Sequence, residues 1–263
     1  MAENAEYMEE QSQEILLGKE EGLDVSLYSN PEYNWLQMEQ IRMGIKDKID
    51  VSSYADPSYS YETMKQIRLS IYSSNDLTAY LDRGFVDDEL EQIRLALEDG
   101  LPINTWLTDD MYVQQIYEIR IGLYEGLNVS AYANPQYNWM QMREIRLGLE
   151  KKLKVSAYTN YLFSHWQMKE IRLGLEAGLD VSSYAKLIFS GTDMKEKREN
   201  LLKEKTPNPA VAEKLGINLK SLAKKEFSIF VEDNGNKAFG YIPWTTGTMM
   251  TVDDVYSALK KRG

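Results

Sequence analysis

Between residues 34 and 57, apolar side chains recur at spacings of three and four, the pattern of one buried face of an α-helix. The positions are Trp35, Met38, Ile41, Ile45 and Ile49. Asn34 and Gln37 form a capping-box pattern, so the helix is expected to begin near residue 35 and to run for about 13 residues. Asp50 then precedes Val-Ser-Ser-Tyr-Ala, which indicates an N-cap and one short helical turn.

This pattern recurs along the chain with a period of 26 residues. Its clearest marker is an isoleucine–arginine pair, found at Ile41-Arg42, Ile67-Arg68, Ile93-Arg94, Ile119-Arg120, Ile145-Arg146 and Ile171-Arg172. One long helix with one short turn cannot bury its apolar face alone, whereas units stacked side by side can. The sequence therefore predicts a mainly α protein, an α-solenoid of about eight helix–short-helix repeats over residues 1–205, with degenerate terminal units.

The period is lost after Lys205, so residues 206–263 are predicted to form a separate small α+β module. Residues 227–232 and 238–244 alternate apolar and polar side chains around Asp233-Asn234-Gly235-Asn236, a strong β-hairpin signal. A helix before the hairpin and a helix beginning near Thr251 complete the prediction. Two roles remain open for the module, which either accepts a partner's strand along residues 227–231 or only caps the array.

Two periodic positions are expected to serve packing between repeats. A small residue such as Gly44 or Gly122 follows each isoleucine by three positions, where adjacent helices are expected to approach most closely. An aromatic residue, usually tyrosine, follows by thirteen positions and is expected to pack between repeats.

The arginine of each pair has two interpretations. A stacked row of guanidinium groups is able to bind phosphate, but a glutamine or glutamate precedes each isoleucine and offers a nearby acceptor. A structural role is therefore favoured for Arg42, Arg68, Arg94, Arg120, Arg146 and Arg172.

The negative charge lies mainly in the repeats. The chain has 263 residues and a formal net charge of −11, and only 8 of its 30 basic and 6 of its 41 acidic residues lie in positions 206–263. The first 205 residues keep 22 basic and 35 acidic residues, which repel phosphate, so direct nucleic-acid binding by the array is not expected.

Composition also bounds the location of the protein. No apolar run approaches 18 residues, so no membrane span is expected. The acidic, polar N-terminus lacks a secretory signal pattern, and the absence of cysteine excludes disulfides and thiolate metal sites. A cytoplasmic protein is the expectation.

Candidate partner-binding residues are those that the repeat pattern does not explain. An irregular set of aromatic residues flanks the starts of the long helices, where exposed loops are expected, and simple packing is weighed equally against binding. This set is Tyr33, Trp35, Tyr59, Tyr61, Tyr137, Trp139, Phe163 and Trp166. The third and fourth repeats depart most from the pattern and add Asp87 and Asp88 as acidic candidates.

Catalytic chemistry finds little support in the sequence. His165 is the only histidine and lies in the capping segment of an ordinary repeat, and no phosphate loop, GxSxG or HExxH motif occurs. Neither an enzymatic activity nor a metal or other cofactor is predicted.

The repeat is most regular from Gln167 to Ala185, where it follows Gln-Met-x-Glu-Ile-Arg-Leu-Gly-Leu-Glu-x-Gly-Leu-Asp-Val-Ser-x-Tyr-Ala. It resembles a tandem repeat of poorly characterised proteins from anaerobic Gram-positive bacteria and their mobile elements, over about residues 11–200. The resemblance implies a repeat type and a role in transfer, phage infection or counter-defence, and it carries over no catalytic residue.

Two functional hypotheses follow from these features. The first is a non-enzymatic scaffold that binds a protein partner of unknown identity. The second is an acidic inhibitor that mimics nucleic acid and occupies a bacterial defence nuclease or DNA-binding protein. The oligomeric state stays open.

Overall fold

The computed structural model describes residues 7–205, 228–233 and 236–241. The chain divides into two compact units, Met1–Arg146 and Leu147–Gly263, and the boundary falls inside helix α7 (Trp139–Glu150). The described residues are mainly helical, which confirms the prediction of a mainly α chain built from repeated helical units.

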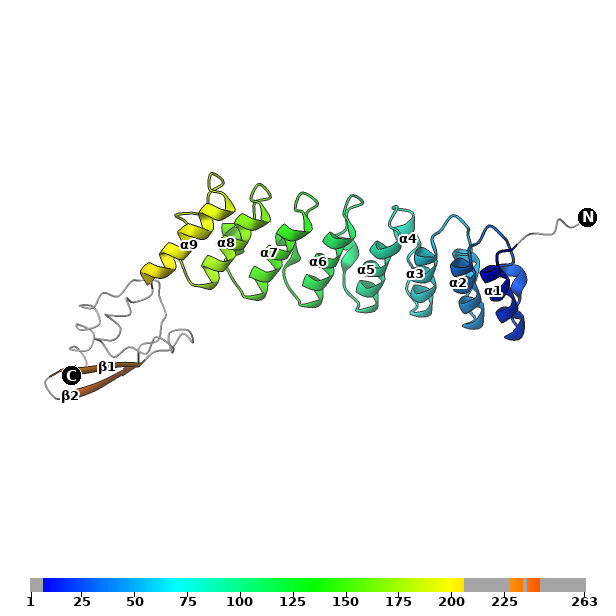
Figure 1. The fold of residues 1–263 in the computed structure, drawn as a ribbon, viewed down its shortest axis with the longest axis horizontal. Helices are drawn as coiled ribbons and strands as arrows, with labels where there is room; N and C mark the ends of the chain where they lie inside the picture. The colour runs from blue at the N-terminus through cyan, green and yellow to red at the C-terminus, as the bar shows by residue number, and fades with distance from the viewer. Residues whose placement is uncertain (1–6, 206–227, 234–235, 242–263) are drawn as a thin grey trace, which may run out of the picture. The chain divides into compact units, whose positions relative to one another are not determined.

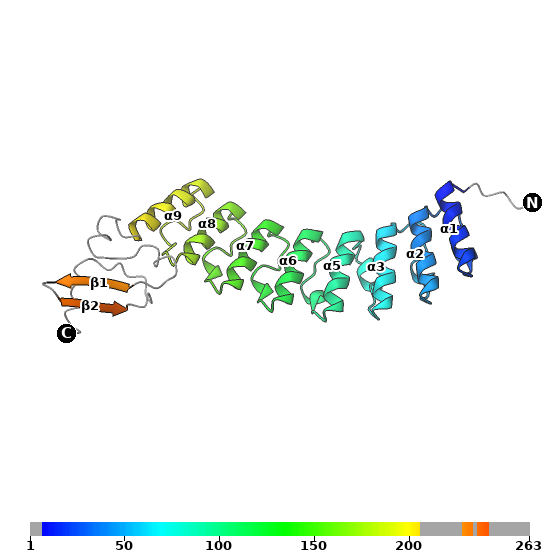
Figure 2. The same cartoon turned by 60° about the horizontal axis from the view of Figure 1, so that its bottom comes forward.

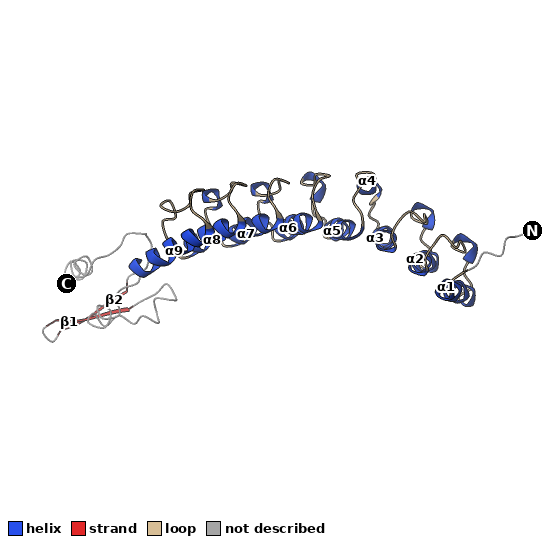
Figure 3. Cartoon of the chain, turned by 45° about the horizontal axis from the view of Figure 1, so that its top comes forward, coloured by secondary structure: helices blue, strands red, loops and turns tan. Residues whose placement is uncertain are grey.

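In the first unit, long helices of 12 residues alternate with short helical turns. The long helices are α1 (Glu9–Glu20), α2 (Trp35–Lys46), α3 (Tyr61–Tyr72), α5 (Asp87–Glu98) and α6 (Val113–Tyr124). The 3₁₀ turns between them are η1 (Val25–Leu27), η2 (Val51–Ser53), η3 (Ile103–Thr105) and η4 (Val129–Ala131), and a short α-helix, α4 (Thr78–Leu81), connects α3 to α5. The long helices lie side by side in chain order (Figure 1), and the short turns lie along one side of this row (Figure 3).

The second unit continues the same alternation. The 3₁₀ turn η5 (Val155–Ala157) leads to α8 (His165–Glu176) and α9 (Gly191–Lys205), which pack side by side (Figure 2). Two further strands, β1 (Ser228–Asp233) and β2 (Asn236–Tyr241), pair antiparallel with Phe230 opposite Phe239. The helices that the sequence predicts within positions 206–263 lie outside the described residues.

Long helices such as α2, α3 and α8 begin at a cap encoded in the sequence. At α2, the Asn34 side chain accepts a hydrogen bond from the Gln37 backbone N–H, and Gln37 Oε1 accepts one from the Asn34 N–H. These two bonds satisfy backbone donors that the first helical turn leaves without partners. The predicted start near residue 35 is confirmed.

The apolar face of each long helix is buried against the short turn that follows it and against the neighbouring repeats. Met38 and Ile41 of α2 have no exposed surface, and neither has Tyr54, which follows η2. The Tyr54 hydroxyl donates a hydrogen bond to the carbonyl oxygen of Gln40, at 3.2 Å, within the same repeat. The short turn thereby closes over its own helix.

The small residue after the isoleucine faces this tyrosine. A Cβ atom placed on Gly44 would overlap the hydroxyl oxygen of Tyr54 and would lie 2.9 Å from Val51 Cγ1. The expectation that the glycine marks the closest approach of adjacent helices is therefore wrong, because the crowding arises inside one repeat. The same overlap occurs at Gly18 with Tyr28, Gly122 with Tyr132, Gly148 with Tyr158 and Gly174 with Tyr184.

Two repeats lack the glycine, and their aromatic residues are placed differently. Ser70 donates its hydroxyl to the Ile67 carbonyl, and Tyr80 lies in α4 with its ring centroid 6.5 Å from that of Phe85. In the next repeat Ala96 occurs together with Trp106, which is half-buried. A Cβ at the small position thus accompanies a change in the aromatic partner.

Candidate functional site

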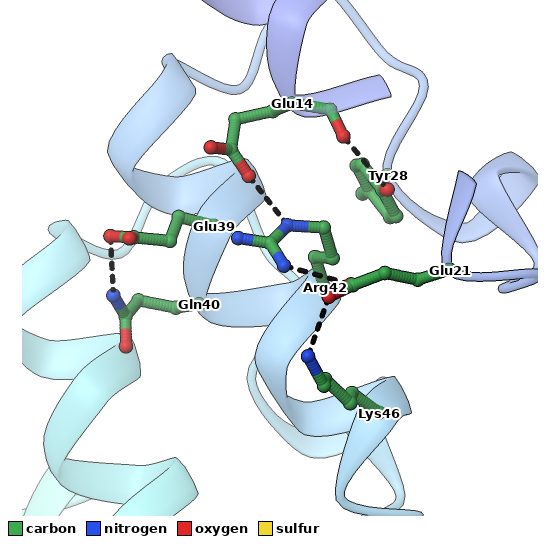
Figure 4. Close-up of polar contacts among 7 residues, drawn as sticks. All are labelled: Glu14, Glu21, Tyr28, Glu39, Gln40, Arg42 and Lys46. Carbon is green, nitrogen blue, oxygen red and sulfur yellow. Dashed lines mark hydrogen bonds and ion pairs between the residues drawn. The ribbon is translucent and has the colours of Figure 1, made fainter. Parts of the chain in front are cut away.

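The arginine of each isoleucine–arginine pair reaches back to the preceding repeat. Arg42 Nε donates to Glu14 Oε2 at 2.7 Å, and Arg42 Nη1 donates to Glu21 Oε2 at 2.9 Å (Figure 4). Lys46 also contacts Glu21, and the hydrogen bonds from Lys46 and Arg42 hold the pKa of the Glu21 carboxyl below its ordinary value. This guanidinium group is occupied by the protein's own carboxylates.

The same bond recurs along the chain and each time joins residues 28 positions apart. We call each of these six bonds an arginine rung. The Nε–oxygen distances are 3.3 Å for Arg68–Gln40, 2.9 Å for Arg94–Gln66, 2.9 Å for Arg120–Gln92, 2.7 Å for Arg146–Glu118 and 2.7 Å for Arg198–Glu170. Arg172 donates to Glu176 of its own helix. The arginines therefore hold repeats together through amide or carboxylate acceptors, and these bonds leave little of them for an external anion.

The capping-box glutamine has a second role that the sequence pattern did not reveal. Gln37 Nε2 donates to the carbonyl oxygens of Pro57 and Tyr59 in the loop of the next repeat, at 3.1 and 2.5 Å. Gln115 donates in the same way to Pro135 and Tyr137. The spacing of these glutamines by multiples of 26 residues is visible in the sequence, but their targets are not, because backbone carbonyls leave no mark in a sequence.

Several of the candidate aromatic residues are part of this packing. Tyr33, Tyr137 and Phe163 are buried, and Tyr59 is half-buried. The Tyr33 hydroxyl donates to the carbonyl oxygen of Ala55 at 2.7 Å, which lies in the next repeat. The expectation that these aromatic positions are exposed is corrected for the three buried residues.

Three candidate tryptophans remain on the surface. Trp35 and Trp139, the first residues of α2 and α7, are 42% and 37% exposed, and Trp166, the second residue of α8, is 59% exposed. Tyr61, which begins α3, is half-buried. These side chains lie where the long helices begin, so they present aromatic surface at corresponding places in different repeats.

The two acidic candidates differ in role. Asp87 Oδ1 accepts hydrogen bonds from the hydroxyl groups of Ser60 and Thr63, and the Asp87 N–H donates to Thr63 Oγ1 at 3.0 Å. Thr63 occupies the position that the capping-box glutamine Gln37 has in α2. The bonds between Thr63 and Asp87 therefore link α3 to the repeat of α5, as the bonds of Gln37 link α2 to the next repeat. Asp88 is exposed.

A further set of exposed residues was not predicted from the sequence. Tyr161, Leu162, Leu187 and Ile188 lie in the loops before α8 and α9 and are exposed. The signal was present in the sequence, because the corresponding loop positions elsewhere are Pro31-Glu32, Pro57-Ser58 and Pro135-Gln136.

The surroundings of the one histidine and the polar side chains of the interior complete the description of the site. His165 lies against Trp166, with ring centroids 4.6 Å apart, and no group of three or more potential metal-binding side chains occurs among the described residues. Every buried side-chain nitrogen or oxygen in this part of the chain has a hydrogen-bond partner. None of its helices is both long and apolar enough to cross a bilayer.

Comparison with known proteins adds no relative to this picture. No protein-family model matches the chain, and neither the curated proteins nor the solved structures contain a match. The structure itself defines the class, an array of helical repeats.

Proposed function

We propose that the chain is a non-enzymatic scaffold that binds a protein partner through the helix-start edge of a repeat solenoid. The observation that carries this proposal is the exposure of Trp35 and Trp139 at the first positions of α2 and α7. The tyrosines over the helix glycines and the arginines of the isoleucine–arginine pairs bond inside the array, whereas Trp35 and Trp139 present apolar area to solvent at the helix starts.

Exposed tryptophans on rigid helices are suited to protein recognition. Tryptophan is enriched among residues that dominate interface energies, because it buries a large area and loses little conformational freedom. Helix caps and inter-repeat glutamines such as Gln37 hold the helix starts in place before a partner arrives. Preorganisation of this kind lowers the entropy lost on binding.

The origin and location of the scaffold belong to the same proposal. The absence of cysteine supports a reducing compartment such as the cytoplasm. The resemblance of the repeat to those of mobile-element proteins supports a phage or mobile-element origin.

The test uses the full chain as bait in extracts of the native host. Trp35→Ala combined with Trp139→Ala is expected to weaken capture of the partner at least about tenfold, equivalent to about 1.4 kcal/mol, because the tryptophans are interface anchors. Tyr72→Ala with Tyr124→Ala is the matched control, since both tyrosines are exposed aromatic residues at the opposite ends of long helices.

Thermal melting of every variant is compared with that of the wild type, because Trp35 and Trp139 are partly buried and a loss of capture must be separated from unfolding. Equal capture by the tryptophan variant and the wild type would contradict the proposal.

A second candidate function rests on the charge of the first unit. Residues 1–146 contain 11 basic and 27 acidic residues, a formal charge of −16. Such a surface fits an acidic protein that mimics nucleic acid and inhibits a bacterial defence nuclease or DNA-binding protein. Salt separates the two candidates: the affinity of a mimic falls steeply as salt is added, whereas an aromatic interface changes little.

A further inference from the structure

Two successive loops of the second unit expose apolar side chains to solvent. Leu162, in the loop before α8, is 62% exposed, and Ile188, in the loop before α9, is 81% exposed. Their neighbours Tyr161 and Leu187 are also exposed, and so is Trp166 at the start of α8. We call these five residues the apolar loop surface.

The repeat architecture does not require these residues to be apolar. Three corresponding loops of the first unit carry Pro31-Glu32, Pro57-Ser58 and Pro135-Gln136, and the other two carry Arg83-Gly84 and Asp109-Asp110. Exposure of this size means that the side chains contribute little to the packing of their own repeats. Neighbouring exposed apolar residues in a folded array mark a site of association.

The two loops are held in defined conformations. Asn160 Oδ1 accepts the Leu162 N–H at 3.0 Å, and the Asn160 carbonyl accepts the Phe163 N–H at 2.9 Å. In the following loop, the Phe189 carbonyl accepts a hydrogen bond from Gln167 Nε2 at 2.6 Å. A partner would therefore meet a surface that is already ordered.

Trp166 lies beside the second loop. A Cβ atom on Gly191, the first residue of α9, would be 2.9 Å from Trp166 Cβ and 3.4 Å from its backbone carbon. Only a glycine allows this close approach, which brings Trp166 next to the residues that follow Ile188.

Three lysines lie on or beside the two loops that carry the apolar loop surface. Lys169 Nζ lies 5.4 Å from the centroid of the Trp166 ring, and Lys197 Nζ lies 4.4 Å from that of Phe189. Lys186, directly before Leu187, is exposed. The nearby carboxylate of Asp193 is engaged in capping α9, where it accepts hydrogen bonds from Ser190.

The charge of this part of the chain agrees with these contacts. Residues 147–205 contain 11 basic and 8 acidic residues, a formal charge of +3, whereas residues 1–146 carry −16. A complementary partner presents apolar side chains among carboxylates.

We infer that the apolar loop surface binds an acidic amphipathic helix of a partner protein. Adjacent repeats are spaced by about 8–10 Å, and apolar residues seven positions apart on a helix are separated by about 10.5 Å. A partner helix lying across the two loops thus places one apolar residue on each, with its glutamates and aspartates facing the lysines. The docking surface rests on the proposed function, since it names one binding site of the same scaffold.

The experiment measures binding of a fluorescent synthetic helix to the full chain by anisotropy. The peptide carries leucines at positions i, i+3 and i+7 among glutamates, and a second peptide has lysine in place of every glutamate. The acidic peptide is expected to bind the wild type, and Leu162→Ser with Ile188→Ser is expected to weaken this binding at least about tenfold. Lys169→Glu with Lys186→Glu should weaken it similarly, through charge reversal.

The matched control replaces exposed apolar residues of the first unit, Leu27→Ser with Tyr72→Ser, and should leave binding of the acidic peptide unchanged. The inference is overturned if the acidic peptide fails to bind, or if Leu162→Ser with Ile188→Ser binds it as well as the wild type does. The inference is also overturned if the wild type binds phosphatidylglycerol vesicles instead of the acidic peptide and Leu162→Ser with Ile188→Ser abolishes this vesicle binding. The surface would then bind a membrane.

The proposed function is tested separately. Suppose that the Trp35 and Trp139 variant no longer captures a host partner, while the Leu162 and Ile188 variant still captures it. This outcome would support the proposed scaffold function and contradict a role of the apolar loop surface in it.

Discussion

At the residue scale, the glycine–tyrosine pair is the most demanding contact of the repeat. The tyrosine hydroxyl occupies the space that a side chain on the glycine would need, and it bonds to a helix carbonyl of the same repeat. In the first unit Tyr132 is fully buried over Gly122 and donates to the carbonyl of Glu118 at 2.9 Å. Glycine is required here for space, since its backbone is helical.

We expect Gly122→Ala to destabilise the array by about 1–3 kcal/mol, because the new methyl group overlaps the Tyr132 hydroxyl. The same substitution should be less damaging in a Tyr132→Phe background, where the overlapping oxygen is gone. Urea unfolding of the two single variants and the double variant measures the coupling between the positions. A cost for Gly122→Ala that is equal in both backgrounds would refute the contact.

The sequence predicted which positions of the repeat are special but not which of them meet. Two positions that recur every 26 residues show the same spacing in the sequence whether their side chains touch within one repeat or across two neighbouring repeats. The sequence therefore indicates that the glycine lies at a close contact, but it does not indicate that the contact is with the tyrosine of the same repeat. The positions of Tyr54 and Val51 over Gly44 show that the contact lies within one repeat.

At the scale of the elements, six arginine rungs join a long helix to the one before it. Their acceptors are of two kinds, neutral amides and carboxylates. Arg120 bonds to the half-buried amide of Gln92, whereas Arg146 bonds to the carboxylate of Glu118, which is buried. Loss of Arg120 would take a hydrogen-bond donor from a neutral amide, whereas loss of Arg146 would take one from a buried carboxylate.

We expect Arg146→Leu to cost about 3–5 kcal/mol, since the Glu118 carboxylate loses its cation in a buried place. Arg120→Leu should cost only about 1 kcal/mol, because the group left without a partner is a neutral amide. Chemical denaturation of both variants makes the comparison. Adding Glu118→Gln to Arg146→Leu should restore part of the loss, and an absence of any restoration would show that charge is not the cause.

Helix positions were well predicted because the signals are local. The Asn34–Gln37 box placed the start of α2, and the apolar spacing placed its buried face. The irregular third repeat was predicted only as a departure from the pattern. The short helix α4 and the bonds between Thr63 and Asp87 depend on contacts between repeats, which local propensity does not encode.

At the scale of the whole molecule, the buried tyrosines make the fold sensitive to alkaline pH. Burial raises the pKa of Tyr28 and of Tyr184 to about 12, from an ordinary value of 10.0. The pKa of Tyr54 is also raised, again through burial. A tyrosine whose folded pKa is raised contributes stability that is present below its unfolded pKa and is lost as the pH rises toward its folded pKa.

We therefore expect the array to lose stability progressively between about pH 10 and about pH 12, because the unfolded chain ionises its tyrosines first. Circular dichroism and phenolate absorbance, followed together, should show loss of helix accompanying ionisation of the buried tyrosines. Tyr28→Phe with Tyr184→Phe should flatten this dependence on pH. Ionisation of all tyrosines with the helices intact would contradict the prediction.

The candidate surface was predicted in outline only. Aromatic residues near helix starts were identified from the sequence, but Tyr33 and Tyr137 are used in packing while Trp35 and Trp139 are exposed. Burial of a loop side chain depends on the next repeat, which lies 26 residues further along the chain. The exposure of Leu162 and Ile188 was not predicted, because aliphatic residues are more often buried than exposed.

The rungs have one more consequence, which concerns how such a gene changes length. Six arginines donate to an acceptor 28 positions earlier, and this acceptor is either an amide or a carboxylate. Removal of residues 93–118, one whole period, would bring Arg120 into register with Gln66, a glutamine like the Gln92 that it now uses. Unequal recombination between these similar stretches would therefore leave the arginine rung with an acceptor, so the array can shorten or lengthen by whole repeats and keep this contact.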